Sequence, residues 1–308
     1  MLKFIQNFLD IKEKGMIVEI VKFNATDGIH LDGILYKCDS TSKKVLIQIH
    51  GMTSNCFKNR DKTIAEKVNE IGIDVLDFNN RGSDIVRYIK NDNVTLIAGM
   101  AYEKVEDCYF DVVGAIEFAI KLGYEEIYLQ GHSLGSTKVV YTYNKLQKEN
   151  SNLINNIKGI ILLSLVDITG LIKSSANKEL IKLAEQKAEN GELMDLMPFK
   201  SFIHPISVKS FIQYTKHNEK FDFARYSNPD DNFEVLNSIK CPIFMRWGNV
   251  NELIKQDAKD LVEFMNKKIT NSNKNISYID GADHSYHGKN EQLAEEIKKF
   301  LGEINVEK

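Results

Sequence analysis

The sequence predicts an α/β protein with a mostly parallel sheet of about eight strands flanked by helices and an inserted cap. Several short segments are almost entirely apolar, as strands buried on both faces of a parallel sheet must be. Longer segments with charged residues and a helical spacing of apolar residues lie between them. One interval between two predicted strands, from Leu165 to Pro242, is far longer than a single crossover connection needs.

Two N-terminal segments are predicted to form an antiparallel hairpin at one end of the sheet. Met16 to Phe23 and Ile29 to Tyr36 are joined by a turn around Asp27 and Gly28, and the second segment alternates apolar and polar residues. This alternation is typical of a strand with one face in solvent.

The remaining strands are predicted to be parallel, because helices separate them and right-handed crossovers connect such units. The clearest helix runs from Ala101 to Leu122, with apolar residues three or four positions apart, and Gly123 ends it. The predicted strands are Val45 to Ile49, Ile73 to Phe78, Ile127 to Gln130, Ile160 to Leu163 and Pro242 to Trp247.

The long interval predicts an inserted cap over residues 168–235, with residues 1–167 and 236–308 forming the core domain. Within it, Ser174 to Asn190 has a helical pattern and Lys200 to Asp231 is rich in Phe and Tyr. These aromatic residues favour either a pocket for an apolar acyl or aryl group or a small core of the cap itself, and the sequence leaves both open.

Composition excludes several classes of function. The net charge is −3 with both signs mixed along the chain, so no basic stripe is present and nucleic acid is not an expected partner. No signal peptide or membrane span is predicted, because no apolar run is long enough. The cysteines are widely spaced, which predicts free thiols and a cytoplasmic location. They are Cys38, Cys56, Cys108 and Cys241.

A nucleophile motif follows the strand that ends at Gln130. Residues 131–135 read Gly-His-Ser-Leu-Gly, which is G-x-S-x-G between a predicted strand and a predicted helix. The two glycines allow a turn so tight that Ser133 is forced into a strained backbone conformation and its hydroxyl projects from the sheet. The Leu134 N–H lies at the helix N-terminus, where it can stabilise an oxyanion.

Two further loops supply the expected partners of Ser133. The loop after Val45 to Ile49 begins with His50 and Gly51, so the Met52 N–H is expected to be the second oxyanion donor, with His50 shaping the loop. After the last predicted strand, Gly281 is followed by His284, which we expect to be the general base. His287 is the competing candidate.

The chain resembles the α/β-hydrolases from residue 16 to residue 304, with the oxyanion loop, nucleophile elbow, cap, acid loop and histidine loop in the expected order. A weaker resemblance links it to an intracellular branch that contains fungal siderophore esterases. The weaker resemblance rests on Leu163 to Asp167, Asn228 to Asp231 and Trp247 to Glu252.

The chain departs from the family at the third member of the catalytic triad. The family pattern G-x-x-D after the penultimate strand places a carboxylate where this chain has Asn251. Glu252 is the first candidate for the acid, because its extra methylene can offset a shift of one residue. Asp167, at the end of the preceding strand, is the second candidate, and Asn251 as a neutral orienting residue is the third.

These residues predict a serine hydrolase, of carboxylesterase type, that cleaves an ester or related acyl compound through an acyl-enzyme. The motifs do not distinguish an esterase from a thioesterase, amidase or peptidase, and a non-catalytic binding or signalling protein with the same fold is the alternative. No dinucleotide-binding or Walker loop and no metal-ligand spacing occurs, so neither cofactor nor metal is predicted. The sequence leaves the substrate and oligomeric state open.

Overall fold

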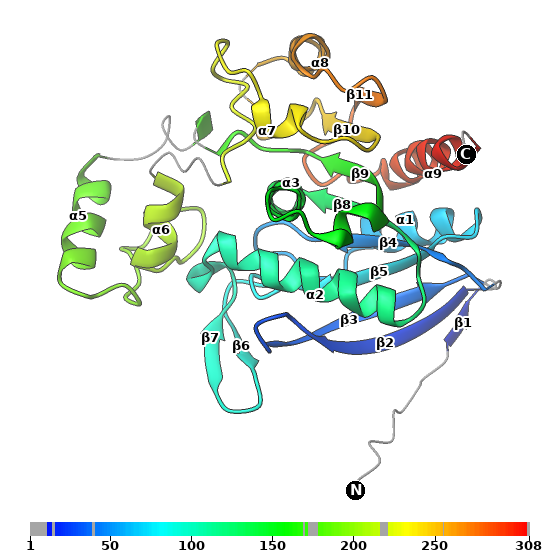
Figure 1. Cartoon of the computed structure of the whole chain (residues 1–308). Helices are drawn as coiled ribbons and strands as arrows, with labels where there is room; N and C mark the ends of the chain where they lie inside the picture. Colours follow the sequence, from blue (N-terminus) through cyan, green and yellow to red (C-terminus); the bar gives the residue numbers. More distant parts are fainter. Residues whose placement is uncertain are drawn as a thin grey trace, which may run out of the picture.

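A nine-stranded sheet forms the centre of the computed structural model, which describes residues 11–13, 16–38, 41–168, 170–171, 178–215, 221–254 and 256–306. Figure 1 shows the sheet with helices on both sides. In spatial order the strands are β1 (Ile11–Glu13), β2 (Met16–Asn24), β3 (His30–Lys37), β5 (Asp74–Asn79), β4 (Lys44–Ile49), β8 (Glu126–His132), β9 (Ile157–Leu163), β10 (Ile243–Gly248) and β11 (Lys274–Ile279).

The six strands from β5 to β11 in this order are mutually parallel, whereas β1, β2 and β3 pair antiparallel. This arrangement confirms the predicted fold class; the short β1 extends the sheet beyond the predicted eight strands. Every residue of β5 and β10 is buried, because helices cover both faces there.

Helices pack on the two faces of the sheet around two apolar clusters. On one face, α1 (Asn59–Asn69) contacts α9 (Asn290–Val306). On the other, α2 (Cys108–Lys121) contacts α3 (Leu134–Lys148), and α8 (Ala258–Lys268) packs near β11.

The predicted helix from Ala101 to Leu122 was wrong at its start, because α2 begins only at Cys108 and two short 3₁₀ turns precede it. The chain bends there so that Glu103 becomes buried and forms an ion pair with Lys138 of α3. A hairpin of β6 (Arg87–Lys90) and β7 (Thr95–Ala98), which the sequence did not predict, projects from the body near this bend (Figure 1).

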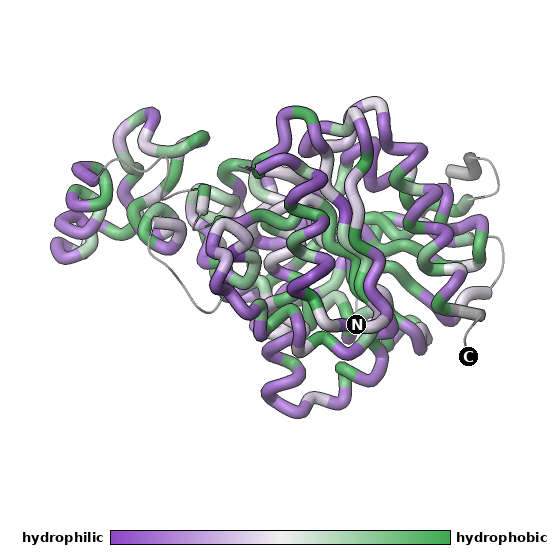
Figure 2. The backbone as a smooth tube through the Cα atoms, turned by 90° about the horizontal axis from the view of Figure 1, so that it is seen from above, coloured by the Kyte–Doolittle hydropathy of each residue, from purple (hydrophilic) through white to green (hydrophobic). Residues whose placement is uncertain are grey.

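The segment between β9 and β10 carries α5 (Lys178–Glu189), α6 (Val208–Thr215) and the short α7 (Glu234–Asn237). Figures 1 and 2 show α5 and α6 to one side of the sheet and its covering helices. The helix predicted from Ser174 begins at Lys178 as far as the structure describes it, since residues 174–177 lie outside the described residues.

Hydrogen bonds fix α6 to the bend before α2. The Ser210 hydroxyl and the Gln213 side-chain amide both donate to the Glu103 carbonyl, at 2.8 and 2.7 Å. The Ser207 N–H donates to the Ala101 carbonyl at 2.8 Å. The placement of α6 therefore depends on backbone groups of the core.

None of the described helices is both long and apolar enough to cross a membrane. None of the four cysteines, all of which lie in the described residues, forms a disulfide. Burial raises the pKa of the Cys241 thiol to about 12, so this thiol stays protonated at neutral pH.

A polar row crosses the buried centre of the sheet beneath α1. Asp77 of β5, Gln48 of β4 and Gln130 of β8 are aligned by the strand register, and Asp77 is only 1% exposed. Burial and the nearby Asp61 carboxylate raise the pKa of Asp77 well above its ordinary value, although Arg60 opposes the shift.

We expect Asp77→Asn to make stability less sensitive to a rise in pH above the ordinary carboxyl pKa. Because the pKa of Asp77 is higher in the folded state, the unfolded chain loses this proton first, and stability falls as pH rises above the ordinary carboxyl pKa. Asparagine cannot ionise, so the Tm of the variant relative to the unmodified protein should be more favourable at pH 8 than at pH 5. Thermal denaturation at both pH values tests this. The exposed Asp230→Asn is the control, and equal behaviour of the two variants would contradict the expectation.

Candidate active site

Ser133 sits at the sharp turn between β8 and α3. Its backbone has φ +55° and ψ −123°, which is a strained conformation for a residue with a side chain. The Ser133 N–H donates to the Leu163 carbonyl at 2.8 Å, and the Ser136 N–H donates to the Ser133 carbonyl at 2.9 Å. These bonds hold the turn so that the Ser133 side chain faces a cavity.

Close backbone contacts explain both glycines of the turn. A Cβ atom at Gly135 would lie 2.1 Å from the Ile49 carbonyl oxygen, and one at Gly131 would lie 2.3 Å from the backbone of Gly135. No side chain fits at either position without moving the main chain.

The loop after β4 lies directly against this turn, since a Cβ at Gly51 would be 3.1 Å from the Ser133 Cβ. His50 is buried and shapes the loop: its Nδ1 lies 2.9 Å from the Gly51 carbonyl, and its Nε2 accepts from the Asn80 N–H at 3.3 Å. Burial, aided by the Lys138 charge, lowers the pKa of His50 to about 3, so this ring is neutral.

The two predicted oxyanion donors line the cavity beside Ser133. Leu134 is the first residue of α3, so its N–H has no partner within the helix. Met52 follows Gly51, which the Ser133 turn contacts. Among the described residues, none accepts a hydrogen bond from either amide.

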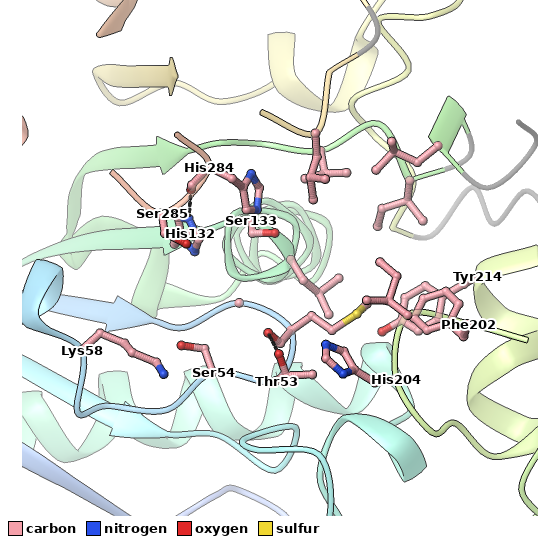
Figure 3. Close-up of a pocket in the computed structure, with 18 of the residues that line it drawn as sticks. Thr53, Ser54, Lys58, His132, Ser133, Phe202, His204, Tyr214, His284 and Ser285 are labelled. Carbon is pink, nitrogen blue, oxygen red and sulfur yellow. Dashed lines mark hydrogen bonds between the residues drawn. The ribbon is translucent and has the colours of Figure 1, made fainter. Parts of the chain in front are cut away.

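His284 lies on the other side of Ser133, and Figure 3 shows its ring beside the Ser133 side chain. Its Nδ1 is hydrogen-bonded to Oε1 of Glu252, whose side chain is only 2% exposed. Glu252, His284 and Ser133 thus follow one another from the interior toward the cavity.

The Glu252 carboxylate is fully supported by donors. Oε2 accepts from the Gly248 N–H at 2.9 Å and from the Ser164 hydroxyl at 2.8 Å, and Oε1 accepts from the Leu253 N–H at 2.9 Å. Burial alone would raise the pKa of Glu252, but the bonds from His284 and these amides outweigh burial and lower it. Glu252 is therefore ionised at neutral pH.

The structure separates the other two candidate acids from His284. Asp167 is buried, and its two oxygens accept from the backbone N–H groups of Gly170 and Ser227, at 2.6 and 2.8 Å. Asn251 is exposed, with φ +49°. Asparagine tolerates this left-handed conformation, and the turn there directs the next side chain, Glu252, inward.

Three supporting residues escaped the sequence reasoning. Ser164, with φ +46°, bonds to Glu252 and lies 3.1 Å from the Tyr286 hydroxyl. His132 Nε2 lies 2.7 Å from the His284 carbonyl, and burial keeps the pKa of His132 well below its ordinary value. His132 was visible inside the motif, but nothing in the sequence connected it to His284. Ser164 and Tyr286 carry no local signal.

His287, the competing candidate base, is 80% exposed and pairs with Asp283 at 2.7 Å. Burial would raise the pKa of Asp283, but the bonds from His287 outweigh it and lower this pKa. The described residues contain no cluster of His, Cys, Asp or Glu able to hold a metal ion.

The cavity has a volume of about 1210 Å³ and runs from the histidine loop to the segment between β9 and β10. That segment contributes Phe202 and Tyr214, whose rings stack at 5.7 Å between centroids. The cavity therefore combines a polar end near Ser133 with an apolar end.

Comparisons with known proteins agree with this architecture. Est1E from Butyrivibrio proteoclasticus is 19% identical, with a TM-score of 0.63 over 93% of this chain and 99% of that one. A soluble variant of monoglyceride lipase from Saccharomyces cerevisiae, in complex with a substrate analog, is 13% identical, with a TM-score of 0.62 over 97% and 99%. The esterase Pf2001 from Pyrococcus furiosus is 18% identical, with a TM-score of 0.55 over 93% and 92%. No curated protein matches the chain.

The fold is therefore that of the α/β-hydrolases, which confirms the resemblance found in the sequence. Residues 109–303 match a family described as "Protein of unknown function (DUF1749)", and the chain belongs to this family.

We expect Gly135→Ala to destabilise the protein by more than about 3 kcal/mol, because its Cβ would overlap the Ile49 carbonyl oxygen. Urea denaturation measures the change. Gly302→Ala is the matched control: this helical glycine has open space around it, so alanine should add about 0.5–1 kcal/mol of stability. Equal stability of the Gly135→Ala variant and the unmodified protein would contradict the packing argument.

Proposed function

We propose that the protein is a serine hydrolase that cleaves a carboxylic ester or related acyl compound through an acyl-enzyme. The observation that carries this proposal is that Ser133 and His284 line one cavity while the buried Glu252 is hydrogen-bonded to His284. Ser133 is the nucleophile, His284 the general base, and Glu252 the acid that orients the ring.

In this mechanism His284 removes the Ser133 hydroxyl proton as Oγ attacks the substrate carbonyl. The N–H groups of Met52 and Leu134 bind the oxyanion of the tetrahedral intermediate. The bond to the leaving group then breaks, and His284 transfers the proton to the departing atom. His284 then deprotonates a water molecule, which attacks the acyl-enzyme carbonyl. As the bond between the acyl group and Ser133 Oγ breaks, His284 returns the proton to Oγ, which releases the acid and restores the hydroxyl.

Glu252 contributes by fixing the ring of His284 and by stabilising its positive charge. Its lowered pKa supports this role, because the carboxylate must remain ionised while His284 is protonated.

The hypothesis of a non-catalytic binding or signalling protein rested on the neutral Asn251. Glu252, at the next position, supplies the negative charge that Asn251 lacks, and this favours a catalytic protein over a non-catalytic one.

We also propose that residues 168–235 form a cap over the cavity. This segment is inserted between adjacent parallel strands and contributes Phe202, Phe211 and Tyr214 to the lining. Together with Leu171 and Ile168, these side chains favour an apolar acyl group. The esterases and the lipase among the structural neighbours support hydrolysis as the general reaction.

Ser133→Ala should abolish covalent labelling by a fluorophosphonate probe and lower the hydrolysis of p-nitrophenyl esters by at least about 10³-fold, since the nucleophile is lost. Gel fluorescence and a chain-length series of esters measure the two effects. Ser151→Ala, which changes a serine outside the cavity lining, should keep the labelling. Labelling that persists in Ser133→Ala would overturn the assignment.

Substitution of the candidate acids should identify the third member of the triad. Glu252→Gln should lower kcat by about 10³- to 10⁴-fold, because the ring loses both its orientation and the compensating charge. Asp167→Asn and Asn251→Ala should change kcat by less than about tenfold, because the Asp167 oxygens accept from backbone N–H groups and Asn251 is exposed. Initial rates for folded variants, checked by circular dichroism, test this ranking, and a larger loss in Asp167→Asn would refute it.

A further inference from the structure

We propose that the substrate is an apolar acyl ester or thioester whose leaving alcohol or thiol carries a carboxylate or phosphate, and that Lys58 recognises this anion. This inference rests on the proposed hydrolase function and specifies its substrate class. Two arguments support it: the charges of the side chains that line the cavity, and the side of Ser133 on which the leaving group must depart.

The described lining of the cavity contains no aspartate or glutamate. Its cationic side chains are Lys58, Lys200 and Arg60, the last of which is paired with Asp61. The whole chain has 43 acidic against 40 basic residues, so the lining departs strongly from the average. A cavity with this charge distribution attracts anions and repels cationic substrates.

The proton transfer from His284 fixes the side of the leaving group. In the proposed mechanism, His284 protonates the departing atom, so this atom must leave on the His284 side of Ser133. Figure 3 shows Ser285 of the histidine loop beside His284, and Ser54 and Lys58 of the loop that leads into α1 on the same left-hand part of the cavity. The contact between α1 and α9 keeps the two loops together.

Lys58 is the cation that Figure 3 shows on the same part of the cavity as Ser285. It is exposed, it lines the cavity, and no described carboxylate lies within 4.0 Å of its ammonium group. Arg60, by contrast, is buried and donates two hydrogen bonds to Asp61, at 2.8 and 3.0 Å, which neutralises its charge. Figure 3 shows Lys58 near Ser54, on the left of the cavity with Ser285.

The opposite end of the cavity suits an uncharged acyl group. Figure 3 shows Phe202 and Tyr214 on the right, away from Lys58. Val166, Ile168 and Leu171 are further apolar residues that line the cavity. A volume of about 1210 Å³ exceeds the usual range of small-ligand pockets, so an apolar acyl part and a charged leaving part both fit.

The test compares two matched esters: the butyrate ester of 4-hydroxybenzoate, which has an anionic leaving group, and that of 4-hydroxybenzamide, which is neutral. The measured quantity is the ratio of their kcat/KM values. We expect Lys58→Gln to lower this ratio about five- to tenfold, and Lys58→Arg to retain it. Because variant and unmodified protein are compared on the same esters, the intrinsic reactivities of the two phenols cancel.

Lys62→Gln is the matched control, since it removes the same charge from α1 at a position outside the cavity lining. It should leave the ratio unchanged. The ratio for the unmodified protein should also fall toward that of Lys58→Gln in 1 M salt, where charge interactions are screened beyond about 3 Å.

A second pair of esters tests the side of the anion: the 4-nitrophenyl monoester of glutarate, with a carboxylate on the acyl part, and 4-nitrophenyl butyrate. A preference for the glutarate ester that disappears in Lys200→Gln would overturn the proposal. An equal ratio for the first pair in Lys58→Gln and the unmodified protein would also overturn it, while Ser133-dependent hydrolysis of the neutral esters would leave the hydrolase assignment standing. Absence of both labelling and hydrolysis would instead refute the proposed function.

Discussion

The close approach of the β8–α3 turn to the end of β4 is the contact on which the site depends. It holds Ser133 in a strained conformation with positive φ and places Gly51 and Met52 directly beside it. Both arrangements require the main chains to meet without intervening side chains. Because β4 and β8 are adjacent parallel strands, their carboxyl ends meet at one edge of the sheet, where ligand sites of open α/β sheets form.

The buried charges near this turn are paired with opposite charges or hydrogen-bonded to polar groups. Lys138 and Glu103 form an ion pair that is almost fully buried, and Lys138 also donates to the Asn80 side chain at 3.0 Å. Asn80 in turn donates to His50, and the Glu103 carbonyl accepts from Ser210 of α6. A continuous set of polar contacts therefore connects the loop after β4 with α6. Such a buried pair specifies geometry more than it adds stability.

Glu252 is a second buried charge that hydrogen bonds compensate, and it has a role in the proposed reaction. Its side chain is removed from water, yet the hydrogen bond from His284 and those from two backbone amides lower its pKa and keep it ionised. These hydrogen bonds to the carboxylate are already in place before His284 is protonated. The carboxylate therefore needs little reorganisation when positive charge develops on the ring beside it. The uncompensated cation Lys58 lies at the cavity, where an anionic group can reach it.

Local patterns in the sequence determined most of the core. Continuous apolar runs identified the parallel strands because burial on both faces excludes polar residues, and the G-x-S-x-G motif located Ser133 because only glycine fits the tight turn. The start of α2 escaped prediction, since the chain bends where Glu103 pairs with the distant Lys138. The hairpin of β6 and β7 also escaped prediction.

Only the tertiary structure decided which carboxylate lies beside His284. Asn251, Glu252 and Asp167 all lie in loops after parallel strands, and their spacing does not reveal where their side chains point. The left-handed turn at Asn251 directs Glu252 inward, whereas backbone amides bind Asp167 elsewhere. The charge balance of the cavity was equally hidden, because Lys58, Lys200 and the histidines come from separate segments that meet only in the folded chain.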